Sequence, residues 1–138
     1  MRIYAFTDGA SRGNPGESGV GVVLKNERGE RLASLYGYIG KTTNNIAEYT
    51  ALQTCLKKAA MLDCTELIVH SDSELMVKQL NGAYKVKDAG IKKEFETVHH
   101  LLQAAAFQFT ISHVPREQNK EADKLANLGI DTKTPLKL

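Results

Sequence analysis

Apolar and polar positions alternate along the first third of the chain and then repeat with helical spacing. Residues 2–8, 18–26 and 31–40 are short runs rich in β-branched and aromatic side chains, which predicts three strands. The turn NERGE joins the second and third runs and is typical of a hairpin. From Thr43 to about Leu62 the apolar positions have the spacing of a helix face, so we expect a long helix there.

The second half of the chain alternates between strands and helices. The run ELIVHSD, residues 66–72, is apolar enough to be covered on both faces, which predicts a central parallel strand. The order βββαβααβα predicts an α/β fold in which a five-stranded mixed sheet carries helices on both faces. The other predicted elements are helices at about 73–81 and 90–106, a strand at 107–114, and a helix from Lys120 to about Leu128.

The composition is that of a single-domain globular protein. The 138 residues are 42% hydrophobic and 25% charged, and the net charge of +2 creates no basic field typical of a nucleic-acid partner. We expect one domain over residues 1–130, a loose tail over 131–138, and a monomer. Cys55 and Cys64 are expected to be free buried thiols. No segment resembles a signal peptide or a membrane span, which favours a cytoplasmic protein with no membrane partner.

Four acidic residues do not fit this pattern as solvated surface. Asp8 ends the first predicted strand, Asp72 ends the buried strand, and Asp123 follows the expected N-cap Asn119 of the last helix. A turn, a cap or a favourable helix dipole explains each of these three alone. Glu48 is different, because it lies on the apolar face of the long helix, where an unpaired carboxylate is strongly unfavourable.

The predicted sheet offers a way to bring these carboxylates together. Neighbouring parallel strands end at the same edge of a sheet, so Asp8 and Asp72 meet there if their strands are adjacent. Crowded carboxylates repel each other and take up protons unless a cation joins them. The chain has no zinc-type cluster of His and Cys, so an oxygen-only ligand set favours Mg²⁺ or Mn²⁺.

Four stretches that contain these acids resemble the motifs of a known family. DGASRGNPGESGVGVV, TTNNIAEYTAL, SDSELMVKQLNG and NKEADKLAN are similar, in this order, to the four motifs of type 1 ribonuclease H. The resemblance implies a ribonuclease H-like fold and an endoribonuclease that hydrolyses the RNA strand of RNA–DNA hybrids to 5′-phosphate products. It also implies two Mg²⁺ ions, or Mn²⁺ as a substitute, with Asp8 as the bridging ligand. The metal ligands implied are Asp8, Glu48, Asp72 and Asp123.

The resemblance also implies substrate contacts around the first and second motifs. The segment between Asp8 and the second predicted strand is expected to form a loop in which Gly9, Gly13 and Gly16 let a nucleic-acid backbone approach closely. Asn14, Asn45 and the backbone of 11–13 are expected to read 2′-hydroxyl groups. Thr43 and Asn44 are expected on the DNA-strand side, although simple helix capping also explains the run TTNN.

Two departures from the family pattern stand out. The interval NGAYKVKDAG is too short for the basic helical protrusion of many members, so Lys85 and Lys87 beside Tyr84 are candidates to grip the DNA backbone. A core tyrosine between solvated lysines is the alternative. The loop before Asp123 also lacks the histidine that many members have, and Arg116 is its natural substitute, with Glu117 a weaker candidate. Arginine stays charged, so it can stabilise phosphate but cannot shuttle protons.

Two other functions remain open. A catalytically weak nucleic-acid-binding module would have no use for four mutually repelling carboxylates. A resolvase-like or integrase-like nuclease on the same fold would share the acids but not the GNPG and TNN stretches. Fold likeness alone does not decide between such functions, so the hypothesis depends on the site residues.

Overall fold

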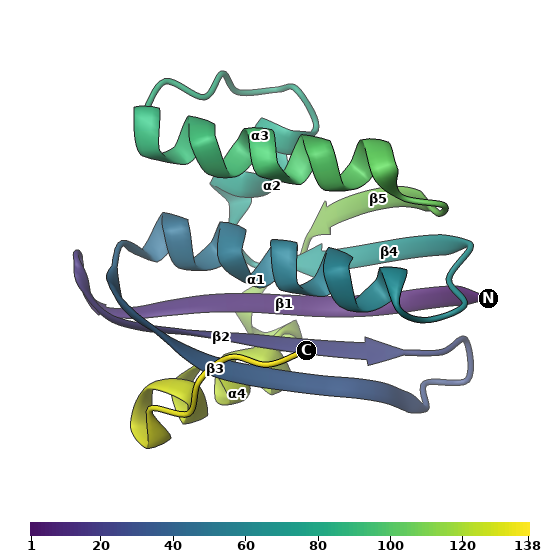
Figure 1. The fold of residues 1–138 in the computed structure, drawn as a ribbon, viewed down its shortest axis with the longest axis horizontal. Helices are drawn as coiled ribbons and strands as arrows, with labels where there is room; N and C mark the ends of the chain where they lie inside the picture. The colour runs from purple at the N-terminus through teal and green to yellow at the C-terminus, as the bar shows by residue number, and fades with distance from the viewer.

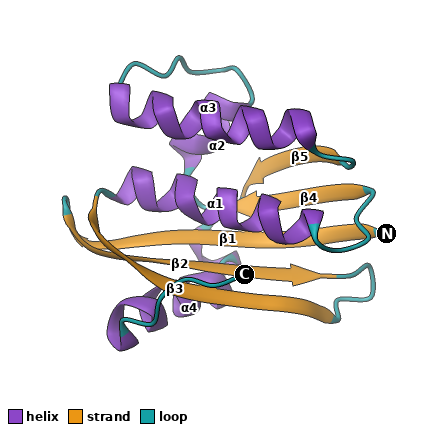
Figure 2. Cartoon of the chain, in the orientation of Figure 1, coloured by secondary structure: helices purple, strands orange, loops and turns teal.

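The structure, a computed structural model, describes residues 1–138 and contains a five-stranded sheet with helices on both faces (Figures 1 and 2). The predicted order of elements and the predicted fold class are confirmed. The strands are β1 (Arg2–Gly13), β2 (Gly16–Lys25), β3 (Arg31–Thr42), β4 (Glu66–Ser71) and β5 (Gln108–His113). The helices are α1 (Asn44–Ala60), α2 (Glu74–Leu80), α3 (Ala89–Ala104) and α4 (Lys120–Thr132), with a short 3-10 helix, η1, at Arg116–Gln118.

The strands lie in the order β3-β2-β1-β4-β5. The first three strands pair antiparallel as a meander, whereas β4 is parallel to both β1 and β5. The apolar run that predicted a central parallel strand is therefore β4, which lies between two parallel neighbours. None of the helices has the length and apolar character that crossing a membrane requires.

The two faces of the sheet are covered unequally. Helix α1 packs on β1 and on α3, whereas α4 packs by itself against β1, β2 and β3 on the opposite face (Figure 1). The main hydrophobic core is a cluster of 18 buried residues that includes Leu52, Leu56 and both cysteines, and it contains no residue of α4. Cys55 and Cys64 are free buried thiols, as predicted.

Strand β1 continues well beyond Asp8, which corrects the predicted loop between residues 8 and 18. Its pairing with β4 ends where Thr7 faces Ser71, but its pairing with β2 continues to the turn at Asn14 and Pro15. Backbone hydrogen bonds form a ladder without help from side chains, so a segment rich in Gly and Ser can still extend a hairpin. The glycine-rich segment is therefore a hairpin arm instead of a loop.

The C-terminal residues lie against the sheet, so the prediction of a loose tail is wrong. Helix α4 runs to Thr132, and the N–H of Tyr38 on β3 then donates to the carbonyl of Thr134 over 2.7 Å. Leu136 lies directly over Gly37, where a side chain on β3 would block it. The edge strand β3 thus offers free backbone groups, and a glycine without a side chain, that hold this segment in place.

Candidate active site

Asp8 and Asp72 lie side by side at one edge of the parallel part of the sheet. Each is the residue that follows the last β1–β4 pair, Thr7 opposite Ser71. The hydroxyl of Ser71 accepts the N–H of Ser73 over 3.1 Å, and the Ser73 hydroxyl caps α2. These bonds fix the backbone on both sides of Asp72, so the expected meeting of the two carboxylates occurs.

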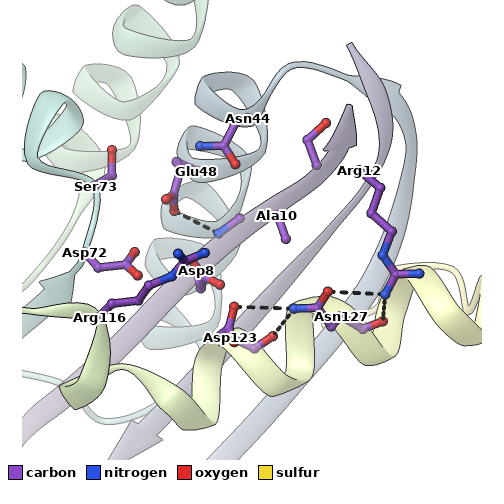
Figure 3. A pocket seen from close by; sticks show the side chains of 12 residues that line it. Asp8, Ala10, Arg12, Asn44, Glu48, Asp72, Ser73, Arg116, Asp123 and Asn127 are labelled. Atoms are coloured by element: carbon purple, nitrogen blue, oxygen red, sulfur yellow. Dashed lines mark hydrogen bonds between the residues drawn. The ribbon is translucent and has the colours of Figure 1, made fainter. Parts of the chain in front are cut away.

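Glu48 reaches the same place from α1 because Gly9 has no side chain. A Cβ at Gly9 would lie 2.2 Å from the backbone carbon of Ala47, so only glycine lets α1 come this close to β1. The N–H of Gly9 then donates to Glu48 Oε1 over 2.8 Å (Figure 3). Gly9 thus serves helix packing, and its amide is the partner that Glu48 needed. Gly9 also lines the cleft, and the expected approach of nucleic acid there stays a prediction.

Asp123 approaches from the opposite face on α4. Asp8 pairs with Gly21 of β2, and a Cβ at Gly21 would lie 2.1 Å from the carbonyl oxygen of Ala122, so both residues face α4. The Asn119 side-chain amide donates to the carbonyl of Thr7 over 2.8 Å, which ties the start of α4 to β1. Asn119 occupies the predicted N-cap position, but its side chain makes no capping hydrogen bond to the helix.

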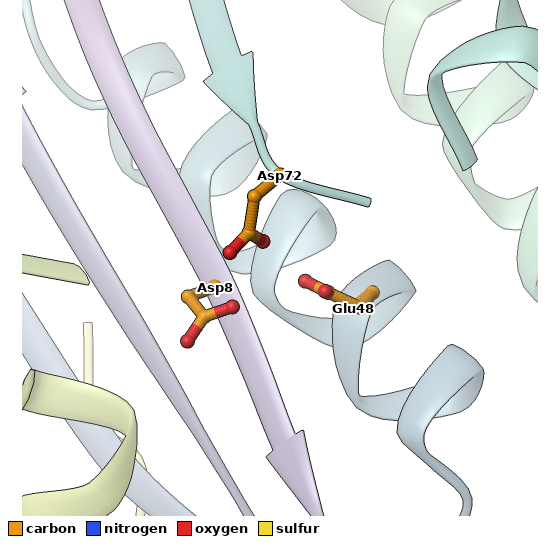
Figure 4. A group of neighbouring side chains, drawn as sticks. All are labelled: Asp8, Glu48 and Asp72. Atoms are coloured by element: carbon orange, nitrogen blue, oxygen red, sulfur yellow. The ribbon is translucent and has the colours of Figure 1, made fainter. Parts of the chain in front are cut away.

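The carboxylates form a crowded and largely buried cluster. One carboxylate oxygen from each of Asp8, Glu48 and Asp72 lies within 4.8 Å of the other two (Figure 4). Burial raises the pKa of Asp8, and the charges of Glu48, Asp72 and Asp123 raise it further. Burial also raises the pKa of Glu48, although the N–H of Gly9 opposes that shift. The structure holds no ion pair to any of these acids, so a divalent cation fits the donor set.

The acids line an open cleft with a volume of about 420 Å³ (Figure 3). Of the side chains predicted to contact substrate, Asn44 lines it, together with the predicted Arg116, whose guanidinium forms no ion pair. Gly9, Ser11 and Arg12, whose backbone was also expected near the substrate, line it as well. The lining residues are Asp8, Gly9, Ala10, Ser11, Arg12, Asn44, Glu48, Asp72, Ser73, Arg116, Asp123 and Asn127.

The other predicted substrate residues of the first two motifs gather at the rim. Asn14 Oδ1 accepts the N–H of Asn44 over 3.2 Å, which joins the β1–β2 turn to the start of α1. Gly13 takes a positive φ of 117° in this turn. Thr43 caps α1 by accepting the N–H of Ile46. Capping therefore explains the threonine of the TTNN run but neither asparagine, and Asn45 is exposed on α1.

Lys85 and Lys87 lie outside the cleft, in the helix-free segment 81–88 between α2 and α3. Both are exposed, and the side chain of Tyr84 is 47% exposed, so the alternative of a core tyrosine is wrong. The Tyr84 hydroxyl accepts a hydrogen bond from Lys78 instead. As expected from the short interval, the structure has no helical protrusion between α2 and α3.

The side chains of Arg12 and Asn127 also line the cleft, and neither was predicted from the sequence. Asp8 and Arg12 lie an even number of residues apart on β1, so they share the face toward α4. Asn127 comes one helical turn after Asp123. The two periodicities would have indicated both residues, provided that β1 was known to continue past Asp8.

Comparison with known proteins gives consistent matches. A family model described as reverse transcriptase-like matches residues 6–129. Ribonuclease HI of Halobacterium salinarum is 41% identical over 94% of this chain, and Ribonuclease H of Methylococcus capsulatus is 31% identical over 94% of it. The crystal structure of LC11-RNase H1 in complex with an RNA/DNA hybrid has a TM-score of 0.88 and 42% identity, and the match covers 94% of this chain and 97% of that one.

The matched relatives differ in length. This chain spans 65% of the Halobacterium protein and 36% of a bifunctional protein of Mycobacterium tuberculosis that is 41% identical, but 89% of the Methylococcus protein. The family model and the Methylococcus match both cover most of the sequence compared. The chain therefore belongs to the type 1 ribonuclease H family.

Proposed function

We propose that this protein is an endoribonuclease that hydrolyses the RNA strand of RNA–DNA hybrids with divalent cations bound at the acid cluster. The observation that carries the proposal is the approach of three carboxylates to within 4.8 Å, with Asp123 lining the same cleft. The related LC11-RNase H1, which was crystallised with an RNA/DNA hybrid, supports this substrate. A cytoplasmic monomer stays a prediction from the sequence.

The cluster would hold two Mg²⁺ ions, with Mn²⁺ as a substitute. Asp8 lies between the other acids, so it would bridge the ions, while Glu48 and Asp72 complete one site and Asp123 the other. When bound, such ions neutralise phosphate charge, help to generate the nucleophile from water, and stabilise the leaving oxygen. The buried carboxylates would remain ionised once the cations balance their charge.

Arg116 would act on the phosphate directly. Its guanidinium lines the cleft without a carboxylate partner, so its donors are free to bind the oxygens of the scissile phosphate. It cannot move a proton, because arginine keeps its proton at any working pH. The exposed Glu117 next to it does not line the cleft, which favours Arg116 of the two.

The rim would distinguish the two strands. The hairpin turn with Gly13 and Asn14 lies against the start of α1, where Asn45 is exposed, and these groups would contact 2′-hydroxyls of the RNA strand. The DNA strand would run past α1 toward the segment 81–88. This segment leads into α3, where Gly90 lies close to Ile46 at the start of α1. Its contacts would be Thr43, Asn44, Lys85 and Lys87.

A cleavage assay tests this function. End-labelled RNA–DNA hybrid, duplex DNA and duplex RNA are incubated with the protein in Mg²⁺ or in EDTA, and the products are resolved on a gel. We expect cleavage of the RNA strand of the hybrid alone, only with the metal, and none with the Asp8→Asn variant. Cleavage that persists in EDTA, or equal cleavage of duplex DNA, would contradict the proposal.

A further inference from the structure

Asp123 is linked to β1 by a chain of hydrogen bonds through Asn127. The Asn127 amide nitrogen Nδ2 donates to Asp123 Oδ1 over 3.3 Å and to the Asp123 carbonyl oxygen over 3.0 Å (Figure 3). Arg12 Nη2 in turn donates to Asn127 Oδ1 over 3.2 Å. The chain therefore runs from the end of β1, across α4, to the acid that approaches the cluster from its own face of the sheet.

The direction of each bond follows from the groups present. A guanidinium can only donate, so the oxygen of the Asn127 amide must face Arg12. The NH₂ group of that amide must then face Asp123, where it meets an acceptor that is a carboxylate. Asp131 holds the other end of the guanidinium, with Nη1 and Oδ1 2.7 Å apart. Arg12 thus fixes both the position and the orientation of the Asn127 amide.

Among the four acids, Asp123 is the one whose carboxylate accepts a hydrogen bond from an amide side chain. Asp8 and Glu48 are each 4% exposed, and the N–H of Gly9 holds Glu48. Asp72 is held by the bonded serines on either side. Asp72 and Asp123 are both half-buried, but Asp123 lies on a helix outside the main core. Apart from its contact with Asp8, its carboxylate is held by the amide of Asn127.

We propose that Asn127 is a positioning residue that orients the Asp123 carboxylate toward the metal site, and that Arg12 sets the orientation of Asn127. This proposal rests on the proposed metal-dependent function. Because Oδ1 accepts from Asn127, Oδ2 is left for a cation, and the carboxylate keeps one rotamer before the cation arrives. Partners that hold a metal ligand in this way typically change metal affinity or activity by about 10–100-fold when they are removed.

Two variants of Asn127 test the proposal, with a matched control on the same helix. Asn127→Ala removes the donor, and Asn127→Asp keeps the shape but replaces the donor by an acceptor. Thr132→Ala is the control, because its hydroxyl makes the same kind of bond, to the Leu128 carbonyl over 2.8 Å, outside the cleft. Calorimetric titration of the substrate-free proteins with Mg²⁺ measures binding directly, and steady-state cleavage over a Mg²⁺ series measures its effect on turnover.

We expect Asn127→Ala to weaken Mg²⁺ binding by about 10-fold and to lower kcat at limiting Mg²⁺, with KM for the hybrid unchanged. Asn127→Asp should be worse, since like charges then face each other. Thr132→Ala should match the native protein. Equal Mg²⁺ affinity in Asn127→Ala and Thr132→Ala, in proteins with native circular dichroism, would overturn the proposal. If the native protein binds Mg²⁺ but cleaves no hybrid, the proposed activity fails while the titration still decides the role of Asn127.

Arg12 has its own test, because a cation at the cleft rim can also contact phosphate. Arg12→Ala should weaken Mg²⁺ binding in the same direction as Asn127→Ala but by less, and Arg12→Lys should recover part of the loss by donating to Asn127 Oδ1. The double variant Arg12→Ala with Asn127→Ala should bind Mg²⁺ as weakly as Asn127→Ala alone. A rise in KM with unchanged Mg²⁺ affinity would show that Arg12 binds substrate and would overturn its orienting role.

Discussion

Asp8 lies directly opposite Gly21 across β1 and β2, and the missing side chain of Gly21 is what gives helix α4 access to Asp8. Any larger residue at that position would meet the backbone of Ala122, the residue before Asp123. One glycine on a strand that carries none of the four site acids thus sets the distance between two of them. The composition of β2 is therefore part of the site.

Replacing Gly21 should damage both stability and activity. In Gly21→Ala the new Cβ would lie 2.1 Å from the Ala122 carbonyl oxygen, so α4 must move away from the sheet. We expect a loss of about 1–3 kcal/mol in the free energy of unfolding, typical of overpacking, and a fall in kcat because Asp123 moves with the helix. Urea denaturation and steady-state kinetics measure the two effects.

Gly90→Ala makes the same change on α3, far from β2. Its Cβ would meet only an Asp88 side-chain oxygen at 3.2 Å and Ile46 at 4.0 Å, and alanine favours a helix more than glycine does. We expect stability to stay the same or to rise by up to about 1 kcal/mol, with native kcat. If the Gly21→Ala protein is as stable and as active as the Gly90→Ala protein, the position of α4 does not depend on Gly21.

The acid variants should lose cleavage and keep their fold. Asp8→Asn, Asp72→Asn and Glu48→Gln should each lower kcat by more than about 100-fold, since even indirect partners of a metal are worth about 10–100-fold. The Gln side chain still offers an oxygen to the N–H of Gly9, so α1 should stay in place. Without metal, thermal stability should equal or exceed that of the native protein, because repulsion is relieved. An Asp8→Asn protein with near-native turnover would rule out the proposed metal site.

The metal-free protein should become less stable as the pH rises above the pKa of an ordinary carboxyl group. Folding raises the pKa of Asp8 and Glu48, chiefly by burial. Below the unfolded pKa of about 4 both groups are protonated in either state and the stability is fully present. Above it the folded protein keeps protons that the unfolded chain has released, so the free energy of unfolding falls until the raised pKa values are passed.

Urea denaturation in EDTA between about pH 5 and pH 9 measures this loss, which can reach about 1.4 kcal/mol per pH unit for each group. Asp8→Asn should flatten the slope by removing one of the two groups. Added Mg²⁺ should restore stability at alkaline pH, because a cation favours the charged carboxylates. A metal-free protein whose stability rises over this range would contradict the pKa directions.

Arg116 and the two lysines should differ in the kinetic constant that they change. Arg116→Ala should lower kcat, because a charge directed at the scissile phosphate acts most in the transition state. Arg116→Lys should recover only part of the loss, since an ammonium cannot reproduce the two parallel hydrogen bonds of a guanidinium. Steady-state kinetics on the hybrid measure kcat and KM separately. If Arg116→Ala raises only KM, the arginine binds phosphate without acting on the chemical step.

Lys85→Ala and Lys87→Ala should raise KM and leave kcat unchanged. Both residues are exposed and lie outside the cleft, so each would neutralise a phosphate away from the reacting bond. Each loss should also make the salt dependence shallower, by about 0.9 in the slope of log affinity against log salt concentration. Lys137→Ala, on the C-terminal segment away from the cleft, is the control. Lysine variants with a native salt slope would remove them from the interface.

The sequence predicted most of the fold because its patterns are local and consistent. The alternation and helical spacing of apolar residues located every strand and every α-helix, although not the short 3-10 helix η1, and the long apolar run of β4 indicated its central place. The extent of β1 could not be predicted, because its second half consists of Gly, Ser, Arg and Asn, and its strand form depends on pairing with β2. The position of the C-terminal segment depends in the same way on the free edge of β3.

The sequence predicted that the four acids lie together, but it did not predict the residues that hold them in place. Glu48 was indicated by a carboxylate on an apolar helix face, and its partner turned out to be the backbone of Gly9, which no side-chain pattern reveals. Arg12 was hidden because the segment that carries it was predicted to be a loop, where alternation has no meaning. The glycines could be seen in the sequence, but which neighbour each one admits depends on how α1 and α4 cross the sheet.

Helix α4 packs alone over β1, β2 and β3 on its face of the sheet and contributes nothing to the main core. Its undocking would therefore leave the core, and the grouping of Asp8, Glu48 and Asp72, intact. Proteins commonly open in such separate units before they unfold globally. The molecule that results would still be folded and still bind a cation, yet it would lack Asp123 and could not cleave. Cleavage activity would thus be lost at a lower temperature than the one at which the protein unfolds. The amide hydrogens of α4 would also exchange with solvent before those of β4.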